Sequence, residues 1–366
     1  MKLVQDYRHI SFIGLSAWLH GAARAEPALP IVAELPPDLR AELIARLTPV
    51  AERLEAARLD AVAAADAQLR MLLPGAVAVG VFFGLSGGSV IAFLLVSLLL
   101  MVLAFLLVDG RTAAQYRAAA KGQVTGLMAS FLSGFRSEPD AALGPAAVDR
   151  WKLLPEVRDV VVEDRLLGHR EGRQVAISRL TITLGPPSRR KATNDGVRLA
   201  VTAVEVDLPW RMARGATVAI GRDSGSELRG APRARHGLRP APLGDAAFDE
   251  RYLVHAEDPA LVAADLNTEV RAGLPRVEAE CRSGTIRLAQ LMPGAQGERP
   301  MLSIQAGYAV VLFPRPLDEP LLEPGPHWRK LDLEATLTAF ASDLARLNHM
   351  LGSAMALPFG KQGTEL

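Results

Sequence analysis

The sequence predicts a membrane-anchored α+β protein. We expect a two-helix transmembrane hairpin with a helical stalk, then a mostly antiparallel sheet domain with a packed helix and a C-terminal amphipathic helix. Three observations predict this class. Residues 71–108 carry no charged side chain, segments rich in Val, Ile and Thr begin after Trp151, and leucines recur every three or four residues near the C-terminus.

The uncharged segment 71–108 is too long for one membrane crossing. As a single helix its 38 residues would extend about 57 Å. A bilayer core is only about 30 Å thick. We therefore expect two spans, 72–85 and 90–108, joined by the Gly- and Ser-rich turn 86–89. Neither span contains an ionisable side chain, which argues against a transporter or a proton relay.

Small residues recur every fourth position along the first span. They form a candidate helix-packing face of Ala76, Gly80, Gly84 and Gly88. Small side chains let two helix backbones approach closely within a membrane. The second span is the favoured partner for this face, and a second copy of the chain is the alternative.

Basic residues flank the hairpin on both sides, while its turn carries no charge. Arg58 and Arg70 precede the hairpin, and Arg111 and Arg117 follow it. The positive-inside rule then predicts a multi-pass protein of the bacterial inner (cytoplasmic) membrane with both termini cytoplasmic. The alternative is signal-peptide cleavage at the small-x-small sequence 23–25, which would place the large domain outside.

Composition limits the function classes. The chain has 41 basic and 40 acidic residues. Its net charge is therefore too small to attract nucleic acid by overall electrostatics. Its single cysteine, Cys281, excludes an intrachain disulfide and fits a reducing compartment. The seven histidines are scattered without ligand spacing. We therefore assign no catalytic, cofactor-binding or metal-binding residues.

Helices are expected on both sides of the hairpin. In the N-terminal cytosolic region 1–70, one amphipathic helix should begin near Asp38, and a second should begin at Thr48-Pro49, where an N-cap and a first helical proline belong. In the juxtamembrane region 109–150, residues 111–135 again favour a helix. We expect the helices next to the membrane to pack together as a stalk.

The cytosolic α+β domain is assigned to 151–330. Its first four expected strands are 157–163, 175–184, 197–208 and 217–220. The first hairpin should turn within 168–172. The alternation changes phase near Ser178-Arg179 and near Ala203-Val204, which predicts a bulge or a change of face.

An arginine-rich segment, 222–242, follows the fourth expected strand. Its Gly, Pro and Ser content predicts an exposed loop. We expect candidate contacts to anionic lipid headgroups at Arg229, Arg233, Arg235 and Arg239. A solvated linker is the alternative. Nucleic acid is disfavoured because no aromatic residue accompanies these arginines.

The segment that follows combines a strand with a helix start. Residues 248–255 predict a strand, and Asp258-Pro259 predicts the start of a helix ending near Gly273. Acidic residues and His255 gather around this point. A solvated polar face explains them most simply, and an acid/base site is the alternative.

The last part of the domain predicts two strands and a helix. Residues 285–288 form a short strand, and 302–312 alternate as one long strand that Pro314 ends. In the C-terminal region 331–366, leucines spaced four and three apart predict an amphipathic helix. Self-association or membrane-surface contact through this helix stays open.

The order of these pieces resembles a bacterial membrane-protein family known as domain of unknown function 3137. The resemblance rests on Leu47-Thr48-Pro49 and Leu54-Glu55-x-x-Arg58 before the hairpin. It rests further on Phe248-Asp249-Glu250-Arg251-Tyr252 leading to Glu257-Asp258-Pro259. The resemblance implies a membrane-anchored α+β domain and provides no catalytic residues.

Two function classes follow. The first is a membrane-anchored interaction or scaffold protein with a protein partner, for which a regulatory module of a transporter is a variant. The second is a membrane-tethered hydrolase acting on an envelope substrate, which would cluster His255, Glu257 and Asp258 with a nucleophile. A deep pocket holding these side chains would favour the hydrolase, and their dispersal would favour the interaction protein.

Overall fold

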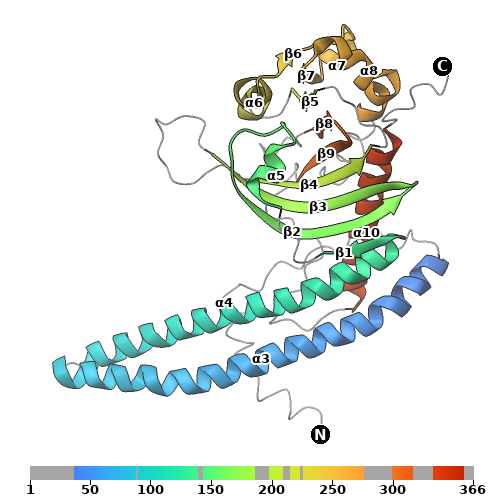
Figure 1. Ribbon diagram of the computed structural model, residues 1–366. Coiled ribbons are helices and arrows are strands. Elements are labelled where there is room, and N and C mark those ends of the chain that lie inside the picture. The colour runs from blue at the N-terminus through green and yellow to red at the C-terminus, as the bar shows by residue number, and fades with distance from the viewer. Residues whose placement is uncertain are drawn as a thin grey trace. The chain divides into compact units, whose positions relative to one another are not determined.

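The described residues fall into two compact units. The hairpin unit comprises those up to Leu127 together with the C-terminal helix up to Asp343, and the sheet unit comprises the remainder. Figure 1 shows the elements of the computed structural model, which describes residues 37–87, 90–138, 143–185, 198–208, 215–222, 226–275, 299–315 and 333–357. Predictions for the N-terminal segment, Cys281 and the strand 285–288 lie outside these residues.

Two long helices form the hairpin unit. Helix α3 runs from Pro37–Gly87 and helix α4 from Val90–Phe131, so the chain reverses where the sequence predicts. Both are long and apolar enough to cross a membrane. The predicted second helix start at Thr48 is wrong, because α3 continues through Pro49. Pro49 has no amide hydrogen, so it cannot donate the usual helical hydrogen bond. One residue before it, the Thr48 hydroxyl donates to the Ile44 carbonyl at 2.7 Å.

Apolar side chains hold the two helices together next to the uncharged segment. A buried cluster joins α3 to α4 through Val62, Ala65, Leu69, Phe105 and Val108. This cluster joins the part of α3 before the first span to the end of the second span. The apolar stripe of α3 also continues across Pro49, the first of its two interior prolines, since Leu47 and Leu54 are both fully buried.

The sheet unit is built on one open sheet of nine strands. The order is β1-β2-β3-β4-β9-β8-β5-β7-β6, and all neighbours are antiparallel. The mostly antiparallel sheet is thus confirmed. The strands are β1 (Phe135–Ser137), β2 (Val157–Arg170), β3 (Arg173–Leu184), β4 (Arg198–Asp207), β5 (Thr217–Gly221), β6 (Arg239–Pro240), β7 (Tyr252–Ala256), β8 (Met301–Gln305) and β9 (Tyr308–Arg315).

The first hairpin turns where predicted, and one of the two predicted irregularities has a register shift beside it. Arg170 pairs with Arg173, and the two turn residues Glu171 and Gly172 have φ of 52° and 75°, as a tight hairpin with right-handed twist requires. The β2–β3 pairing shifts register between Val162 and Asp164, which pair with Leu180 and Arg179, so an irregularity lies beside the predicted position Ser178-Arg179, with the extra residue on β2. Near Ala203-Val204, β4 pairs with β3 and with β9 without a register shift, so no bulge lies there.

The predicted long strand 302–312 is two strands. It folds into the β8–β9 hairpin around Ala306 and Gly307, whose φ is +86°. Nor does Pro314 end the second strand, because it pairs with Val201 of β4. The pairing with β8 stops at Leu312, so no neighbour on that side needs an amide hydrogen from the proline.

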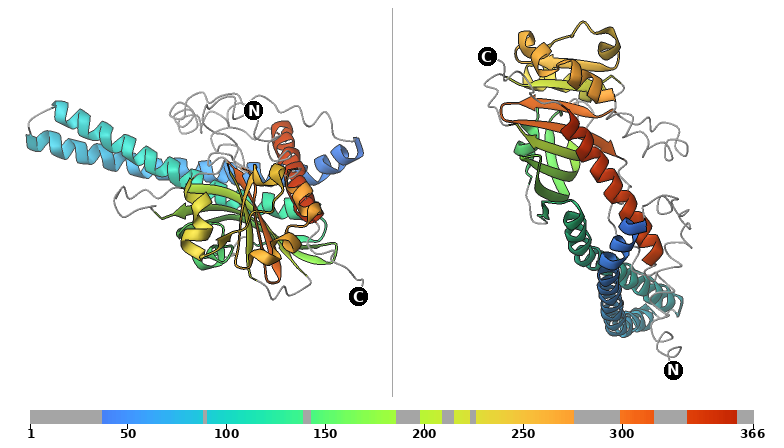
Figure 2. Two further views of the ribbon diagram at one scale, coloured as in Figure 1. Left: turned by 90° about the horizontal axis from the view of Figure 1, so that it is seen from above. Right: turned by 90° about the vertical axis from the view of Figure 1, so that its right-hand side faces the viewer.

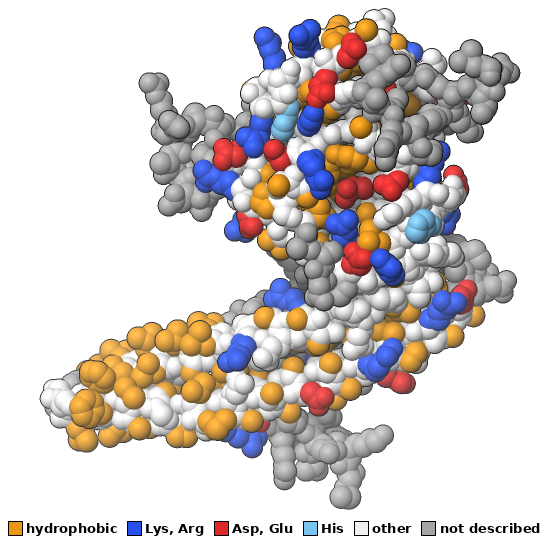
Figure 3. All heavy atoms as spheres, in the orientation of Figure 1, with side chains coloured by type: hydrophobic (Ala, Val, Ile, Leu, Met, Phe, Trp, Pro, Cys, Tyr) orange, Lys and Arg blue, Asp and Glu red, His pale blue; other side chains and the backbone are white. Residues whose placement is uncertain are grey.

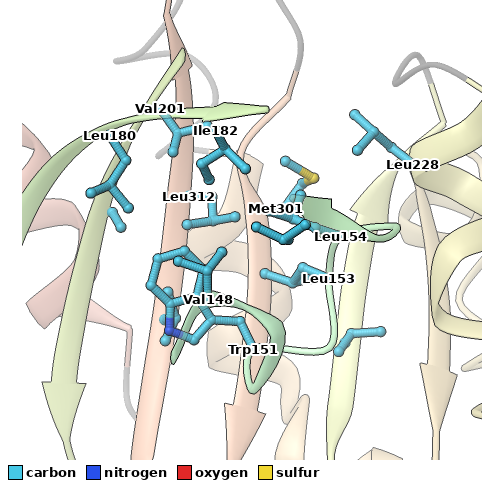
Figure 4. Packing of buried hydrophobic residues seen from close by; sticks show 14 of the residues in the cluster. Val148, Trp151, Leu153, Leu154, Leu180, Ile182, Val201, Leu228, Met301 and Leu312 are labelled. Carbon is cyan, nitrogen blue, oxygen red and sulfur yellow. The ribbon is translucent and has the colours of Figure 1, made fainter. Parts of the chain in front are cut away.

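One face of the sheet carries the main core. The short helix α5 (Pro145–Asp149) and the segment after it bring Val148, Trp151, Leu153 and Leu154 onto the strands (Figure 4). Trp151 is the largest fully buried side chain among those described. Helix α6 (Ser226–His236) closes the same core with Leu228.

The opposite face is buried as well. Asp265 of helix α8 (Val262–Asp265) accepts a hydrogen bond from Thr217 of β5 at 2.6 Å. A further helical segment, 268–275, follows α8. The C-terminal helix α10 (Leu333–Ala356) forms as predicted and is drawn in red in Figure 2, and its part from Leu344 onward belongs to the sheet unit. Its residues Leu347, Leu351 and Ala354 are each 2% exposed or less.

The segment before β7 differs from its prediction. Phe248 belongs to the short helix α7 (Ala246–Asp249), and the strand begins only at Tyr252. The Phe248 and Tyr252 rings stack with centroids 4.9 Å apart. The turn η2 (Pro259–Leu261) begins where predicted, with Asp258 as its N-cap.

Candidate functional site

Residues 226–236 of the arginine-rich segment form helix α6 and not the predicted exposed loop. Helix α6 turns Leu228 and Ala231 inward, where they are 6% and 3% exposed. Gly237, with φ of +68°, ends the helix, and the Leu238 amide donates back to the Pro232 carbonyl at 3.0 Å. Such an end is typical of glycine after a helix.

A hollow of about 650 Å³ lies between α6 and the sheet edge formed by β7 and β6. We call it the cationic groove. It is lined by Arg229, Gly230, Arg233, Ala234, Pro240, Leu253 and His255. Both groove arginines are exposed and lie one helical turn apart, so helical spacing places their side chains on the same face of α6.

His255 forms the inner wall of this groove. Its side chain is on β7 and is only 7% exposed. Its Nδ1 atom is buried and makes no hydrogen bond. Burial, followed by the charge of Arg233, lowers the pKa of the His255 imidazole. The ring is therefore neutral at pH 7, and one of its nitrogens is a donor.

The structure separates the four candidate arginines. Arg229 and Arg233 line the groove. Arg235 faces away and donates to the Asp149 carboxylate at 3.1 Å. Arg239 is exposed on β6. Sequence reasoning missed His255 as a neighbour of these arginines. Helical spacing could have indicated that the first two lie on one face, because they are four residues apart and the apolar Leu228 and Ala231 beside them point inward.

The proposed hydrolase residues do not come together. Glu257 forms an ion pair with Lys152, and Asp258 caps the Ala260 amide at 3.0 Å. Both acidic side chains are exposed, whereas His255 is buried against α6. Within the described part of the chain, no group of three potential metal ligands is found.

The other acidic residues near β7 stabilise turns. Asp249 accepts from the amide of Gly244 at 2.9 Å. Asp245 accepts from the Phe248 amide at 3.3 Å and from Arg271 at 3.0 Å. These carboxylates have structural partners. Their close spacing in the sequence therefore needs no catalytic role to explain it.

A second polar group, which we call the paired cluster, lies across the sheet on β2, β3 and β9. It consists of Glu163, Asp164, Arg179, Thr181 and Arg315. Arg179 donates to Asp164 at 2.9 Å, and Arg315 pairs with Glu163. Burial opposes ionisation of Glu163, but the Thr181 hydrogen bond and both arginines together lower its pKa.

A third polar group lies beneath Trp151. Burial raises the pKa of the Glu205 carboxyl, although the Arg165 charge and a hydrogen bond from Trp151 lower it. Burial also raises the pKa of Tyr308, whose hydroxyl donates to the Arg150 carbonyl at 3.3 Å. Glu205 and Tyr308 are both half-buried.

The candidate helix-packing face of the hairpin unit lies against α4. A Cβ atom added at Gly80 would lie 1.8 Å from the Ser97 Oγ, and one added at Gly84 would lie 2.6 Å from the Phe93 Cβ. Ala76 is 8% exposed. Gly88 lies outside the described residues. Only small residues allow this close approach.

Comparison with known proteins finds no matching family model, no similar curated protein and no similar solved structure. The resemblance to the domain of unknown function 3137 therefore stays a prediction. Function must be argued from the described residues alone.

Proposed function

We propose that this chain is a membrane-anchored interaction protein. The hairpin of α3 and α4 inserts into the bacterial inner membrane, both termini face the cytoplasm, and the sheet unit binds a protein partner there. A continuous apolar surface on the hairpin carries the anchoring part of this proposal.

That surface is confined to the end of the hairpin. All but three of the exposed large apolar side chains recorded for the described residues lie between Met71 and Leu107. Leu85 is 81% exposed, Val90 74% and Leu99 67%. Figure 3 shows the hydrophobic side chains gathered where α3 and α4 meet. Soluble monomers rarely expose a continuous apolar patch above a few hundred Å².

Helix length and flanking charge fit a membrane. Residues 90–108 of α4 rise about 28 Å, close to the thickness of a bilayer core of about 30 Å. Arg70 of α3 and Arg111 of α4 lie at the polar end of the hairpin, whose turn is uncharged. By the positive-inside rule, these arginines favour a cytoplasmic location for the start of α3 and for the end of α4.

The interaction role is favoured over hydrolysis by the positions of the residues that a hydrolase would have to bring together. Glu257 and Asp258 are exposed and engaged in an ion pair and a helix cap. Purification of the full chain in mild detergent should yield a partner in fixed stoichiometry. Repeated recovery of the protein alone would count against the interaction role.

Two matched leucine variants test anchoring. Leu99 and Leu59 are both exposed, at 67% and 49%, but only Leu99 lies in the proposed span. Leu99→Arg should weaken retention in carbonate-washed membranes, because an arginine at a span centre costs about 2.5–3.5 kcal/mol. Leu59→Arg should leave retention unchanged. Release of the unmodified chain by carbonate would refute anchoring.

A reporter fused after Leu366 tests sidedness. A reporter active only in the cytoplasm should give signal, and one active only outside should give none. External signal would overturn the proposed orientation and would indicate cleavage near Ala25 or an odd number of spans.

A further inference from the structure

The cationic groove contains several polar groups without a protein partner. Neither Arg229 nor Arg233 forms an ion pair with any carboxylate in the described ranges, whereas the neighbouring Arg235 pairs with Asp149. The Nδ1 atom of His255 is also unpartnered, in a side chain that is more than nine-tenths buried. All three of these unpaired residues line the same hollow.

This arrangement costs stability in the absence of a ligand. Like charges one helical turn apart repel each other, and a buried polar atom without a hydrogen bond loses its interaction with water. An anion placed between the arginines would remove the repulsion and would lie beside the His255 ring, which lines the same hollow. The groove is therefore arranged for an anion with several oxygen atoms.

We infer that the cationic groove binds a phosphate group, carried by a phosphomonoester. Each guanidinium can donate two parallel hydrogen bonds to phosphate oxygens. A phosphomonoester carries between one and two negative charges near pH 7 and offers three terminal oxygens. A carboxylate has a single charge and only two oxygens, so it matches two arginines and a histidine less well.

The shape of the groove indicates an ester larger than free phosphate. Its volume of about 650 Å³ leaves room beside the charged group. Ala234, Pro240 and Leu253 provide apolar lining for the organic part of the ligand. The phosphomonoester can belong to a soluble metabolite or to a lipid headgroup, since both present the same chemistry.

Calorimetric titration of the full chain in neutral detergent tests this inference. Inorganic phosphate and glycerol phosphate should each give a larger heat of binding than chloride does at equal ionic strength. Arg229→Ala or Arg233→Ala should weaken binding about ten- to hundredfold, as expected for a lost charged hydrogen bond. Arg233→Lys keeps the charge but loses the planar fork, so it should weaken binding less than the alanine variant.

Arg235→Ala and Arg239→Ala are the matched controls. Both remove one positive charge close to the groove without removing a lining residue, so they should bind glycerol phosphate as the unmodified chain does. Equal binding by the double variant Arg229→Ala/Arg233→Ala would overturn the inference. So would the absence of binding by both phosphate probes to a chain whose circular dichroism shows it folded.

Nanodiscs distinguish the two sources of the phosphate group. The chain is reconstituted in phosphatidylcholine alone or in phosphatidylcholine with phosphatidic acid, and the titration with glycerol phosphate is repeated. Weaker binding in the presence of phosphatidic acid supports a lipid headgroup as the ligand, and unchanged binding supports a soluble phosphomonoester. The detergent titration goes beyond the proposed function and does not depend on it, so either can fail alone.

Discussion

The paired cluster and the cationic groove are each built around two arginines, yet their surroundings differ. In the paired cluster both arginines are less than a tenth exposed and meet carboxylates. In the groove both arginines are exposed and lie beside a neutral histidine. The difference follows from the neighbouring elements, because β2 supplies two acidic residues to one cluster and β7 supplies only an imidazole to the other.

The largest expected effect is on the paired cluster. Arg179→Met should lower the free energy of unfolding by about 3–5 kcal/mol, because it breaks a buried ion pair by removing the arginine that neutralises the Asp164 carboxylate. Urea denaturation in mild detergent measures this change.

A double variant separates lost charge pairing from lost packing. Asp164→Asn/Arg179→Met removes both charges and should recover much of the stability, since an uncharged replacement of a buried pair is often tolerated. If the double variant were as unstable as the single variant, packing and not charge would be the function of Arg179.

A pH-dependent effect is expected at Glu163. Its pKa is lowered in the folded state, so its contribution is present above the ordinary value of 4.5 and is lost as pH falls through the lowered value. Glu163→Gln should therefore cost about 2 kcal/mol near neutral pH, and the cost should shrink in acid. A pH-independent difference in unfolding free energy would contradict this.

Long, strongly patterned elements could be predicted from the sequence. The hairpin turn between Gly87 and Val90 follows from hydropathy and length, and the leucine pattern of α10 follows from helical spacing. Thr48-Pro49 wrongly predicted a helix start, because an interior proline after a threonine has the same sequence pattern as an N-cap with proline at the first helical position. Tertiary packing of Leu47 and Leu54 holds the helix together across it.

The alternation of apolar and polar residues could not show that the predicted strand 302–312 is the two strands of the β8–β9 hairpin. Val310, Val311, Leu312 and Phe313 are all buried, because helices cover both faces of the sheet. A strand buried on both faces loses the polar side that alternation depends on. The decisive signal was Gly307, whose positive φ permits the turn.

Only part of the candidate site could be predicted from the sequence. The arginines of 222–242 were recognised, but Gly, Pro and Ser content outweighed the inward spacing of Leu228 and Ala231 that indicates a helix. The proximity of His255 arises from sheet pairing, which no local pattern contains. The same sheet pairing turns Glu257 away toward Lys152.

A smaller effect should follow from the exposed arginine of α6. Arg235→Ala breaks the ion pair with Asp149, whose two side chains are 40% and 34% exposed. The expected cost in unfolding free energy is at most about 1 kcal/mol. High salt should reduce the difference between this variant and the unmodified chain.

The smallest effect, of opposite sign, should come from the groove itself. Arg229→Ala and Arg233→Ala each remove a like-charge repulsion along α6 and place a strong helix former there. In phosphate-free buffer, unfolding free energy should therefore stay the same or rise by up to about 0.5 kcal/mol. A loss comparable to that of Arg179→Met would mean that these arginines stabilise the fold. A neutral or stabilising change would indicate that they are kept for a ligand.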